Sequence, residues 1–406
     1  MPGAAVHSQL TRAALELQPR PVGDTQALIA DYCNYPDRCF SRWNELKKYS
    51  FFLDGIQFHY LPDTPWNELY RYWKPEDGTL RRARKFVNEN FRHAHAGFDF
   101  CITSFLREYR QGQEEEAKKY LGCLLHMLED STFAFHTLEG PGGADAFVLD
   151  RLMDAPFSPA AELAKLSAEG LSLPDHRPVS LGGSAGEFLM RLYAEYVRAA
   201  SRARKISFRY LLAKAEDRPS DAREAQTGQY HNSVKFCADV IFTLYQLARG
   251  EGCGQPDPFP LAELEPHEFP FGGPGAYCCR SIDYDFAMAP DGITRLPLEL
   301  ANGGRCSSGI AFGNHFEGSL RYWIAPGVFG RFTARFGYHS SLPGKGGTEV
   351  EIVNGGQVIR TLRLDPDHPV AGLEIRDPQG DFGLSFRNRR PAGVLVLAEP
   401  VFHRTR

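Results

Sequence analysis

The most informative stretch of the chain is YLGCLLHMLEDSTFAFH, which runs from Tyr120 to His136. It places His126, Asp130 and His136 inside an otherwise apolar segment. His126 and Asp130 are four residues apart, so a helix here would bring both side chains to one face. Unpaired polar groups are costly to bury, and two imidazoles with a carboxylate form a ligand set that suits zinc. From these residues alone, a simple hydrogen bond between His126 and Asp130 is the alternative.

Length and composition restrict the class of protein. The chain has 406 residues, of which 43% are hydrophobic and 12% aromatic, so we expect one large or two ordinary domains with a real core rather than global disorder. The formal net charge of -4 provides no basic field that would attract nucleic acid or anionic lipid from a distance. No run of about 18 apolar residues predicts a transmembrane segment. The first residues do not resemble a signal peptide, so we expect a cytoplasmic protein as written, or else a mature form.

Apolar residues recur at helical spacing through the first 250 residues, where strand-like alternation is nearly absent. We therefore predict an all-α helical bundle over residues 1–250. The segments with the clearest helical spacing are Gln9–Leu17, Leu80–Arg110, Glu114–Glu129, Glu187–Ala213 and Val234–Arg249.

The composition changes at Gly250. Residues 251–275 are rich in proline and glycine and predict a linker. After it, short alternating or apolar runs replace the helical pattern, and Asn354-Gly355-Gly356 stands between two of them as a hairpin signal. We therefore predict an antiparallel β-sandwich over residues 276–406, and a multidomain α and β protein overall.

Three further residues of metal-ligand type precede the opening stretch: His7 near the N-terminus, Asp37 in NYPDRC and His59 in LDGIQFHYLPDTP. With them, the chain resembles the zinc-dependent phospholipase C family, whose superfamily includes the single-strand-specific zinc nucleases. The resemblance rests on the H-x3-D-x5-H spacing within the opening stretch and on the order of the three earlier residues. It implies a helical fold, zinc as cofactor, a phospholipid or a membrane surface as partner, and secretion if the chain is a mature form.

The resemblance implies a cluster of two to three zinc ions. His126, His59 and Asp37 would hold one ion. Asp130 would bridge it to a second ion, held by His7 and by the N-terminal amine and carbonyl. Closely spaced zinc ions neutralise a phosphodiester and lower the pKa of a bound water toward neutrality. Asp37 is also the expected general base, which is the role suggested for its counterpart in the family.

The sequence supplies fewer of the expected ligands for the third ion. The family combines a histidine at the position of His136 with a downstream His-x3-Glu or His-x3-Asp. Here Asp150 supplies a carboxylate, but Ala146 stands where that histidine would be. His231 is the best remote substitute, with Lys235 at the position of the expected carboxylate. For His231, a hydrogen-bonded helix residue is the alternative interpretation.

Two other features of the helical region have open interpretations. Glu129 lies beside Asp130 but on another side of the expected helix, where it is either solvated or hydrogen-bonded to a ligand residue. Lysine and arginine cluster between Arg198 and Arg209, where a solvated helix face is the default and a phosphate-contacting groove is the alternative.

The region from Gly309 to Phe402 is similar to galactose-binding-like sandwiches, including carbohydrate-binding modules. A targeting module for a glycan or a lipid headgroup is expected, with an inert structural domain as the alternative. The expected function of the whole chain is zinc-dependent phosphodiester hydrolysis of the phospholipase C type. A nuclease that acts on single-stranded nucleic acid with the same metals is one alternative. A non-catalytic, zinc-stabilised binding protein is another.

Overall fold

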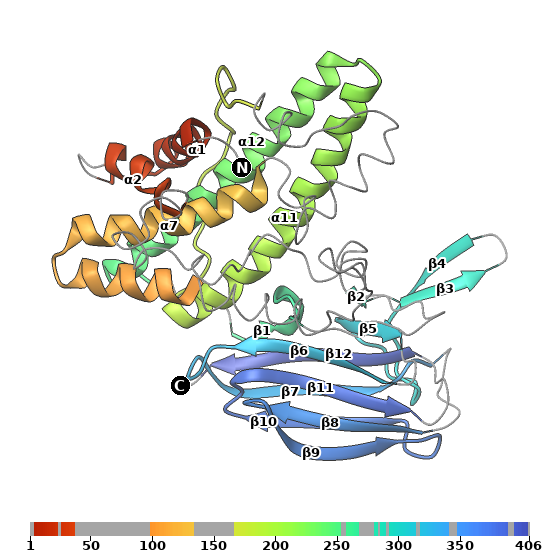
Figure 1. Ribbon diagram of the computed structural model, residues 1–406. Helices are drawn as coiled ribbons and strands as arrows, with labels where there is room; N and C mark the ends of the chain where they lie inside the picture. The colour runs from red at the N-terminus through yellow and green to blue at the C-terminus, as the bar shows by residue number, and fades with distance from the viewer. Residues whose placement is uncertain are drawn as a thin grey trace, which may run out of the picture. The chain divides into compact units, whose positions relative to one another are not determined.

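The structure is a computed structural model in which the chain divides into two compact units, Met1–Gly254 and Gln255–Arg406. Figure 1 shows helices in the first unit and antiparallel strands in the second, which confirms the predicted fold class. The residues described are 4–22, 26–36, 98–133, 166–252, 257–267, 280–282, 285–289, 292–313, 317–340, 347–388 and 394–404.

Most described helices of the first unit agree with the predicted periodicity. Helix α2 was not predicted, and the first and last helices begin earlier than predicted. The last helix begins at Pro219, well before the predicted start at Val234. Its first half buries small and polar side chains, including Ala222, Ala225 and Gln229, so it has no apolar stripe to reveal it in the sequence. The helices are α1 (Ala4–Glu16), α2 (Gln26–Tyr32), α7 (Glu114–Thr132), α11 (Ala185–Ala215) and α12 (Pro219–Ala248), and residues 98–110 are also helical.

Helix α7 is the central helix of this unit. Every one of its residues from Tyr120 to Thr132 is buried, and it packs against α1, α2, α11 and α12. A helical segment that is enclosed on all sides is expected to be apolar nearly all round, and from Tyr120 to Leu128 the only ionisable group besides the Tyr120 and Cys123 side chains is His126. His126, Glu129 and Asp130 are therefore placed in the interior, where each needs a partner.

Helix α2 approaches α7 closely at Gly122. A Cβ atom at this position would lie 2.6 Å from the carbonyl carbon of Tyr32 and 2.8 Å from the amide nitrogen of Cys33. Only glycine allows the two backbones to come this close. The close approach brings the C-terminal end of α2 against the part of α7 that carries His126.

The second unit is built from two antiparallel sheets and a separate hairpin, β3–β4. One sheet has the order β10-β7-β12-β5-β2, with β1 also paired to β12, and the other has the order β6-β11-β8-β9. The strands are β1 (Phe259–Pro260), β2 (Arg280–Ile282), β3 (Asp285–Ala289), β4 (Gly292–Leu296), β5 (Gly309–Gly313), β6 (Glu317–Ile324), β7 (Phe329–Tyr338), β8 (Thr348–Asn354), β9 (Gln357–Leu364), β10 (Val370–Arg376), β11 (Gly380–Asn388) and β12 (Val394–Arg404).

Aromatic rings join the two sheets. Phe332 of β7 and Phe402 of β12 belong to one sheet, and Phe382 of β11 belongs to the other. The centroid of the Phe382 ring lies 5.0 Å from that of Phe332 and 5.6 Å from that of Phe402. This inter-sheet core is what the alternating apolar residues predicted.

The hairpin between β8 and β9 confirms the turn signal in the sequence. Gly355 and Gly356 connect the two strands with φ angles of 61° and 77°. Both angles lie in the left-handed region, which a two-residue hairpin turn requires and which glycine adopts at low cost.

Part of the predicted linker is folded into the sandwich. In the described portion of residues 251–275, Phe259 and Pro260 form β1 and pair with Phe402 and Val401 of β12. The high proline and glycine content of this segment predicted no strand. Strand β1 lies at the edge of its pairing, where proline is tolerated. Among the described residues, no helix is long and apolar enough to span a bilayer.

Candidate metal centre

Helix α7 supplies two members of the candidate centre. His126 and Asp130 are one turn apart, as predicted, and both are 1% exposed. Nε2 of His126 lies 3.2 Å from Oδ2 of Asp130. Three glutamates in the first turn of α7 complement the positive end of the helix dipole and favour this helix.

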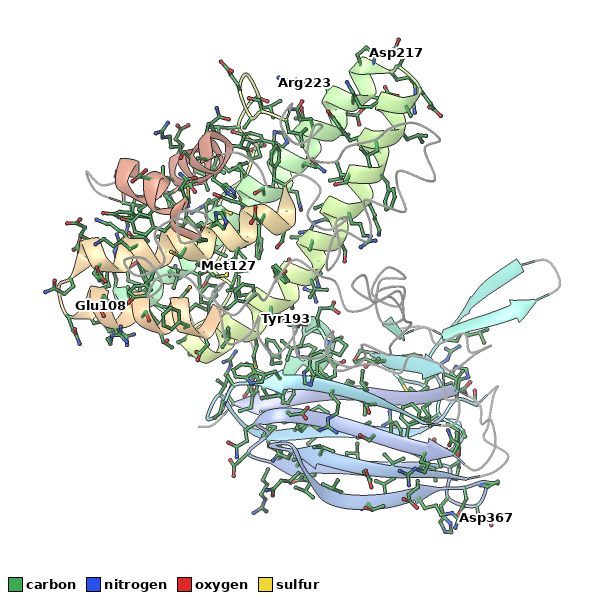
Figure 2. All side chains as sticks on the ribbon, viewed as in Figure 1. Glu108, Met127, Tyr193, Asp217, Arg223 and Asp367 are labelled. Atoms are coloured by element: carbon green, nitrogen blue, oxygen red, sulfur yellow. The ribbon has the colours of Figure 1, made fainter. Side chains whose placement is uncertain are left out.

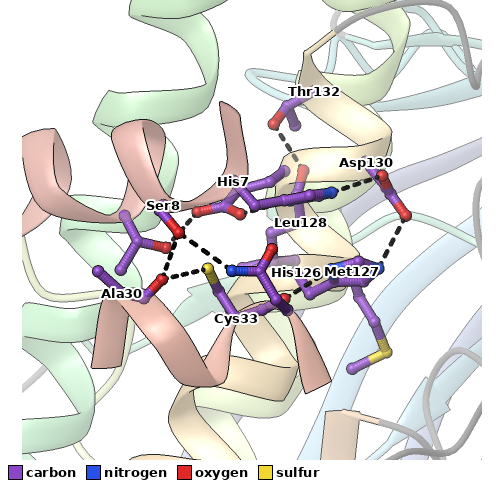
Figure 3. Close-up of polar contacts among 12 residues, drawn as sticks. His7, Ser8, Ala30, Cys33, His126, Met127, Leu128, Asp130 and Thr132 are labelled. Carbon is purple, nitrogen blue, oxygen red and sulfur yellow. Dashed lines mark hydrogen bonds and ion pairs between the residues drawn. The ribbon is translucent and has the colours of Figure 1, made fainter. Parts of the chain in front are cut away.

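Helix α1 brings His7 to the same place. Its side chain is fully buried, and its Nε2 atom lies 3.4 Å from Oδ1 of Asp130. The rings of His7 and His126 are stacked, with their centroids 4.2 Å apart. Figure 3 shows Asp130 facing both rings, one carboxylate oxygen toward each imidazole. Ligand atoms of these three residues all lie within 4.8 Å of one another.

Glu129 fixes the orientation of His7. Nδ1 of His7 donates a hydrogen bond of 2.8 Å to Oε2 of Glu129. The hydroxyl of Thr11 donates one of 2.5 Å to the other carboxylate oxygen. Glu129 is fully buried, so it is the hydrogen-bonded partner of the candidate ligand His7 and not a solvated side chain. Its signal in the sequence was a second carboxylate within the apolar stretch.

A backbone carbonyl fixes the orientation of His126. Nδ1 of His126 lies 2.7 Å from the carbonyl oxygen of Cys33, which can only accept a hydrogen bond, so Nδ1 carries the proton. Nε2 is then the atom that faces Asp130. A histidine held through one nitrogen and offering the other is the usual arrangement around a metal.

Two buried carboxylates dominate the electrostatics. Burial opposes a charge on His7, but hydrogen bonds to Asp130 and Glu129, together with their negative charges, outweigh it and raise the pKa of His7 to about 10. Burial also raises the pKa of Glu129, against the opposing effects of His7 and Thr11. The two buried carboxylates therefore stabilise a positive charge next to them, carried either by a proton on His7 or by a metal cation.

The donor set and its spacing fit zinc. Zinc–nitrogen and zinc–oxygen bonds of about 2.0–2.2 Å at a tetrahedral angle place neighbouring ligand atoms roughly 3.3–3.6 Å apart. The distance from Asp130 to Nε2 of His7 is 3.4 Å, within this range, and that to Nε2 of His126 is 3.2 Å, just below it. Imidazole and carboxylate are ligands that zinc accepts.

The remaining predicted site residues are placed as follows. Four of them lie outside the described residues: Asp37, His59, His136 and Asp150. His231 is on α12, where its Nε2 atom lies 3.0 Å from the carbonyl oxygen of Ser172. The described structure does not bring His231 into the group formed by the other histidines.

No protein-family model matches the chain, and no curated protein matches it. Among solved structures, it is similar to alpha-toxin from Clostridium absonum, with 11% identity and a TM-score of 0.35, over 100% of this chain and 95% of that one. It is similar to Clostridium perfringens alpha-toxin from an avian strain, with 10% identity and a TM-score of 0.35, over 100% and 97%.

Similarity to carbohydrate-binding modules is confined to part of the chain. For the tandem CBM51 modules of a family 98 glycoside hydrolase from Streptococcus pneumoniae, the identity is 18% and the TM-score 0.31, over 37% of this chain. The chain spans 48%, about half, of that structure. A Clostridium perfringens CBM51 in complex with methyl-galactose is 15% identical, with a TM-score of 0.27, over 36% and 99%. At these scores, no activity or ligand is transferred to this chain.

Proposed function

We propose that this chain is a zinc-dependent phosphodiester hydrolase of the phospholipase C type, acting on a glycerophospholipid. The observation that carries the proposal is the position of Asp130, which faces the edges of two stacked imidazoles. One carboxylate oxygen faces Nε2 of His7 and the other faces Nε2 of His126. The family resemblance assigns these three residues to two adjacent zinc ions, with the aspartate between them.

In this proposal, His126 and Asp130 hold one ion together with Asp37 and His59, and His7 and Asp130 hold the second. When bound, zinc would neutralise charge on the phosphodiester and lower the pKa of a water near it. A third ion would use His136, with Asp150 and His231 as the remaining candidates.

The chain's own groups orient the site. Glu129 holds the proton on Nδ1 of His7, and the carbonyl of Cys33 does the same for His126. Both imidazoles therefore already present Nε2 toward Asp130. Binding of a cation then needs no reorientation of the rings, which favours it. Asp37 is the proposed general base.

Hydrolysis assays test this proposal. The full-length protein, purified with its metal, should release a phosphorylated headgroup from phosphatidylcholine dispersed with detergent, and a zinc chelator should abolish the release. Asp130→Asn should be inactive. Asp175→Asn makes the same chemical change at an exposed position and should keep full activity.

The other functions have distinct outcomes in the same assays. Cleavage of single-stranded DNA, with the phospholipid left intact, would replace the proposal with a nuclease. If the zinc-loaded protein hydrolysed neither substrate, the remaining interpretation would be a non-catalytic binding protein.

A further inference from the structure

Helix α11 carries an unusual concentration of positive charge. From Tyr196 to Ala215 its sequence contains no acidic residue, although the chain as a whole has a net charge of -4. The basic residues in this span are Arg198, Arg202, Arg204, Lys205, Arg209 and Lys214. The proposed hydrolase function uses none of them.

One face of α11 combines this charge with exposed apolar side chains. Phe208 is 37% exposed and Leu212 is 50% exposed, whereas most large apolar side chains of this unit are buried. Lys205, Phe208 and Leu212 are spaced by three and four residues, so they share one face of the helix. We call the exposed residues Arg202, Lys205, Phe208, Arg209 and Leu212 the basic face.

The opposite side of α11 packs against protein. Ala203, Ser207, Tyr210 and Leu211 are buried, and α11 runs antiparallel to α12, with Asp217 at the turn between them (Figure 2). The buried side of α11 therefore makes the packing contacts of the helix, and the basic face takes no part in them. The exposure of Phe208 and Leu212 is not needed for the fold.

The cations of the basic face are held only weakly. Nη2 of Arg209 lies 3.3 Å from Oε1 of Glu224, and the two side chains are 66% and 72% exposed. Arg202 donates to the side-chain oxygen of Asn232. Lys205 forms no ion pair with the described residues. Exposed pairs of this kind contribute little and can be exchanged for another anion.

Acidic residues near the turn offset only part of this charge. Glu216 and Asp221 both pair with Arg218. From Glu216 to Glu224 the sequence has four acidic residues and two arginines, a net charge of -2, against the six basic residues between Tyr196 and Ala215.

We propose that the basic face of α11 docks this protein on an anionic phospholipid bilayer. The cations would contact headgroup phosphates, while Phe208 and Leu212 would enter the boundary between headgroups and acyl chains. Exposed aliphatic groups between cations suit a bilayer better than a nucleic acid, which offers no apolar phase to Leu212. Because the net charge of the chain is negative, this attraction is local and short-range. The surface lies outside the metal cluster, so docking does not depend on hydrolysis.

Co-sedimentation of the full-length protein with vesicles tests the proposal. We expect binding to vesicles of phosphatidylcholine with phosphatidylserine, weak binding to phosphatidylcholine alone, and loss of binding at high salt. Lys205→Glu should weaken binding by about tenfold or more, since each basic residue near an anionic surface contributes about 1 kcal/mol. The double variant Phe208→Ser, Leu212→Ser should also bind weakly. Arg12→Glu makes the same charge reversal at an exposed position on α1 and should bind as the wild type.

Each other outcome overturns the proposal. Equal binding of the wild type to both kinds of vesicle would remove the role of charge, and wild-type binding by Lys205→Glu would remove the role of this face. If Lys205→Glu lost single-stranded DNA binding but kept vesicle binding, the face would be a nucleic-acid site instead. Hydrolysis of a soluble short-chain phosphodiester by Lys205→Glu should be unchanged, so a failure of docking is separate from a failure of the proposed hydrolase function.

Discussion

Nδ1 of His7 lies 2.8 Å from a carboxylate oxygen of Glu129, and both side chains are fully buried. The adjacent residue, Asp130, faces the other nitrogen of the same imidazole. One ring is thus held between two consecutive carboxylates of a single helix. The carboxylate of Glu129 sets the orientation of the ring. The carboxylate of Asp130 lies where a ligand shared by two zinc ions would lie.

The first prediction concerns Glu129. Glu129→Leu should weaken zinc binding by about 10–100-fold, because Nδ1 of His7 loses its acceptor. Glu129→Gln should lose much less, since an amide oxygen still accepts that hydrogen bond. Calorimetric titration with zinc, and the absorption spectrum of the cobalt-substituted protein, would measure affinity and ligand geometry. Glu187→Gln removes another buried carboxylate and should not change either. Zinc affinity of Glu129→Leu equal to that of the wild type would refute the positioning role.

The second prediction concerns the number of ions. If Asp130 bridges two ions, His7→Ala and His126→Ala should each reduce the zinc content by one ion per chain. Asp130→Asn should remove both ions and lower the thermal midpoint, because binding of a metal by the folded state alone contributes to stability. Metal analysis of the purified variants measures this. Unchanged zinc in Asp130→Asn would exclude the bridge.

The third prediction concerns the contact between α2 and α7. In Gly122→Ala the new methyl group would overlap the backbone of Tyr32 and Cys33, so the variant should lose about 1–3 kcal/mol of unfolding free energy. It should also bind zinc less tightly, because the carbonyl of Cys33 orients His126. Chemical denaturation and zinc titration measure the two effects.

Gly228 provides the matched control for that variant. It also lies within a helix, but a Cβ atom there would meet only the side chain of Ile206, at 3.7 Å. Gly228→Ala should therefore stabilise the protein by about 0.5–1 kcal/mol through helix propensity. Equal effects of the two substitutions would show that the close approach at Gly122 does not matter.

The fourth prediction concerns acid stability of the sandwich. Burial raises the pKa of Asp381, but hydrogen bonds to His267 and Arg321 and their charges outweigh it and hold this pKa well below the usual value of 3.8. The resulting stability is present above pH 3.8 and is lost as the pH falls below it toward the folded-state pKa. Asp381→Asn should therefore be less stable than the wild type at neutral pH and lose less stability on acidification. Thermal unfolding of the full-length protein across acidic pH measures this, with the exposed Asp367→Asn as control.

Much of the first unit could be predicted from periodicity. The apolar spacing in the opening stretch predicted α7, and the four-residue interval predicted that His126 and Asp130 share a face. The position of His7 could not be derived from spacing, because it depends on how α1 packs on α7. It was predicted only through the order of residues in the resembling family.

The burial of Glu129 could not be read from the sequence for a related reason. On an isolated helix the Glu129 side chain points well away from that of Asp130. The sequence does not show whether that side of the helix is buried or exposed. Thr11 and His7 on α1 are hydrogen-bonded to Glu129 there, and which helix covers that side depends on tertiary packing. The metal-ligand roles of all the predicted site residues stay predictions, and so does glycan binding by the sandwich. The structure brings together three of them, His7, His126 and Asp130.

The separation in sequence of the two helices that form the cluster has one more consequence. Glu129 stands 122 residues after His7, so an ion shared by His7 and Asp130 would act as a removable cross-link that closes a very long loop. In covalent cross-links of about 100 residues, loop closure alone corresponds to roughly 4.7 kcal/mol. Extraction of the metal should therefore free the N-terminal helix first, and limited proteolysis should cleave near α1 before the rest of the helical unit unfolds.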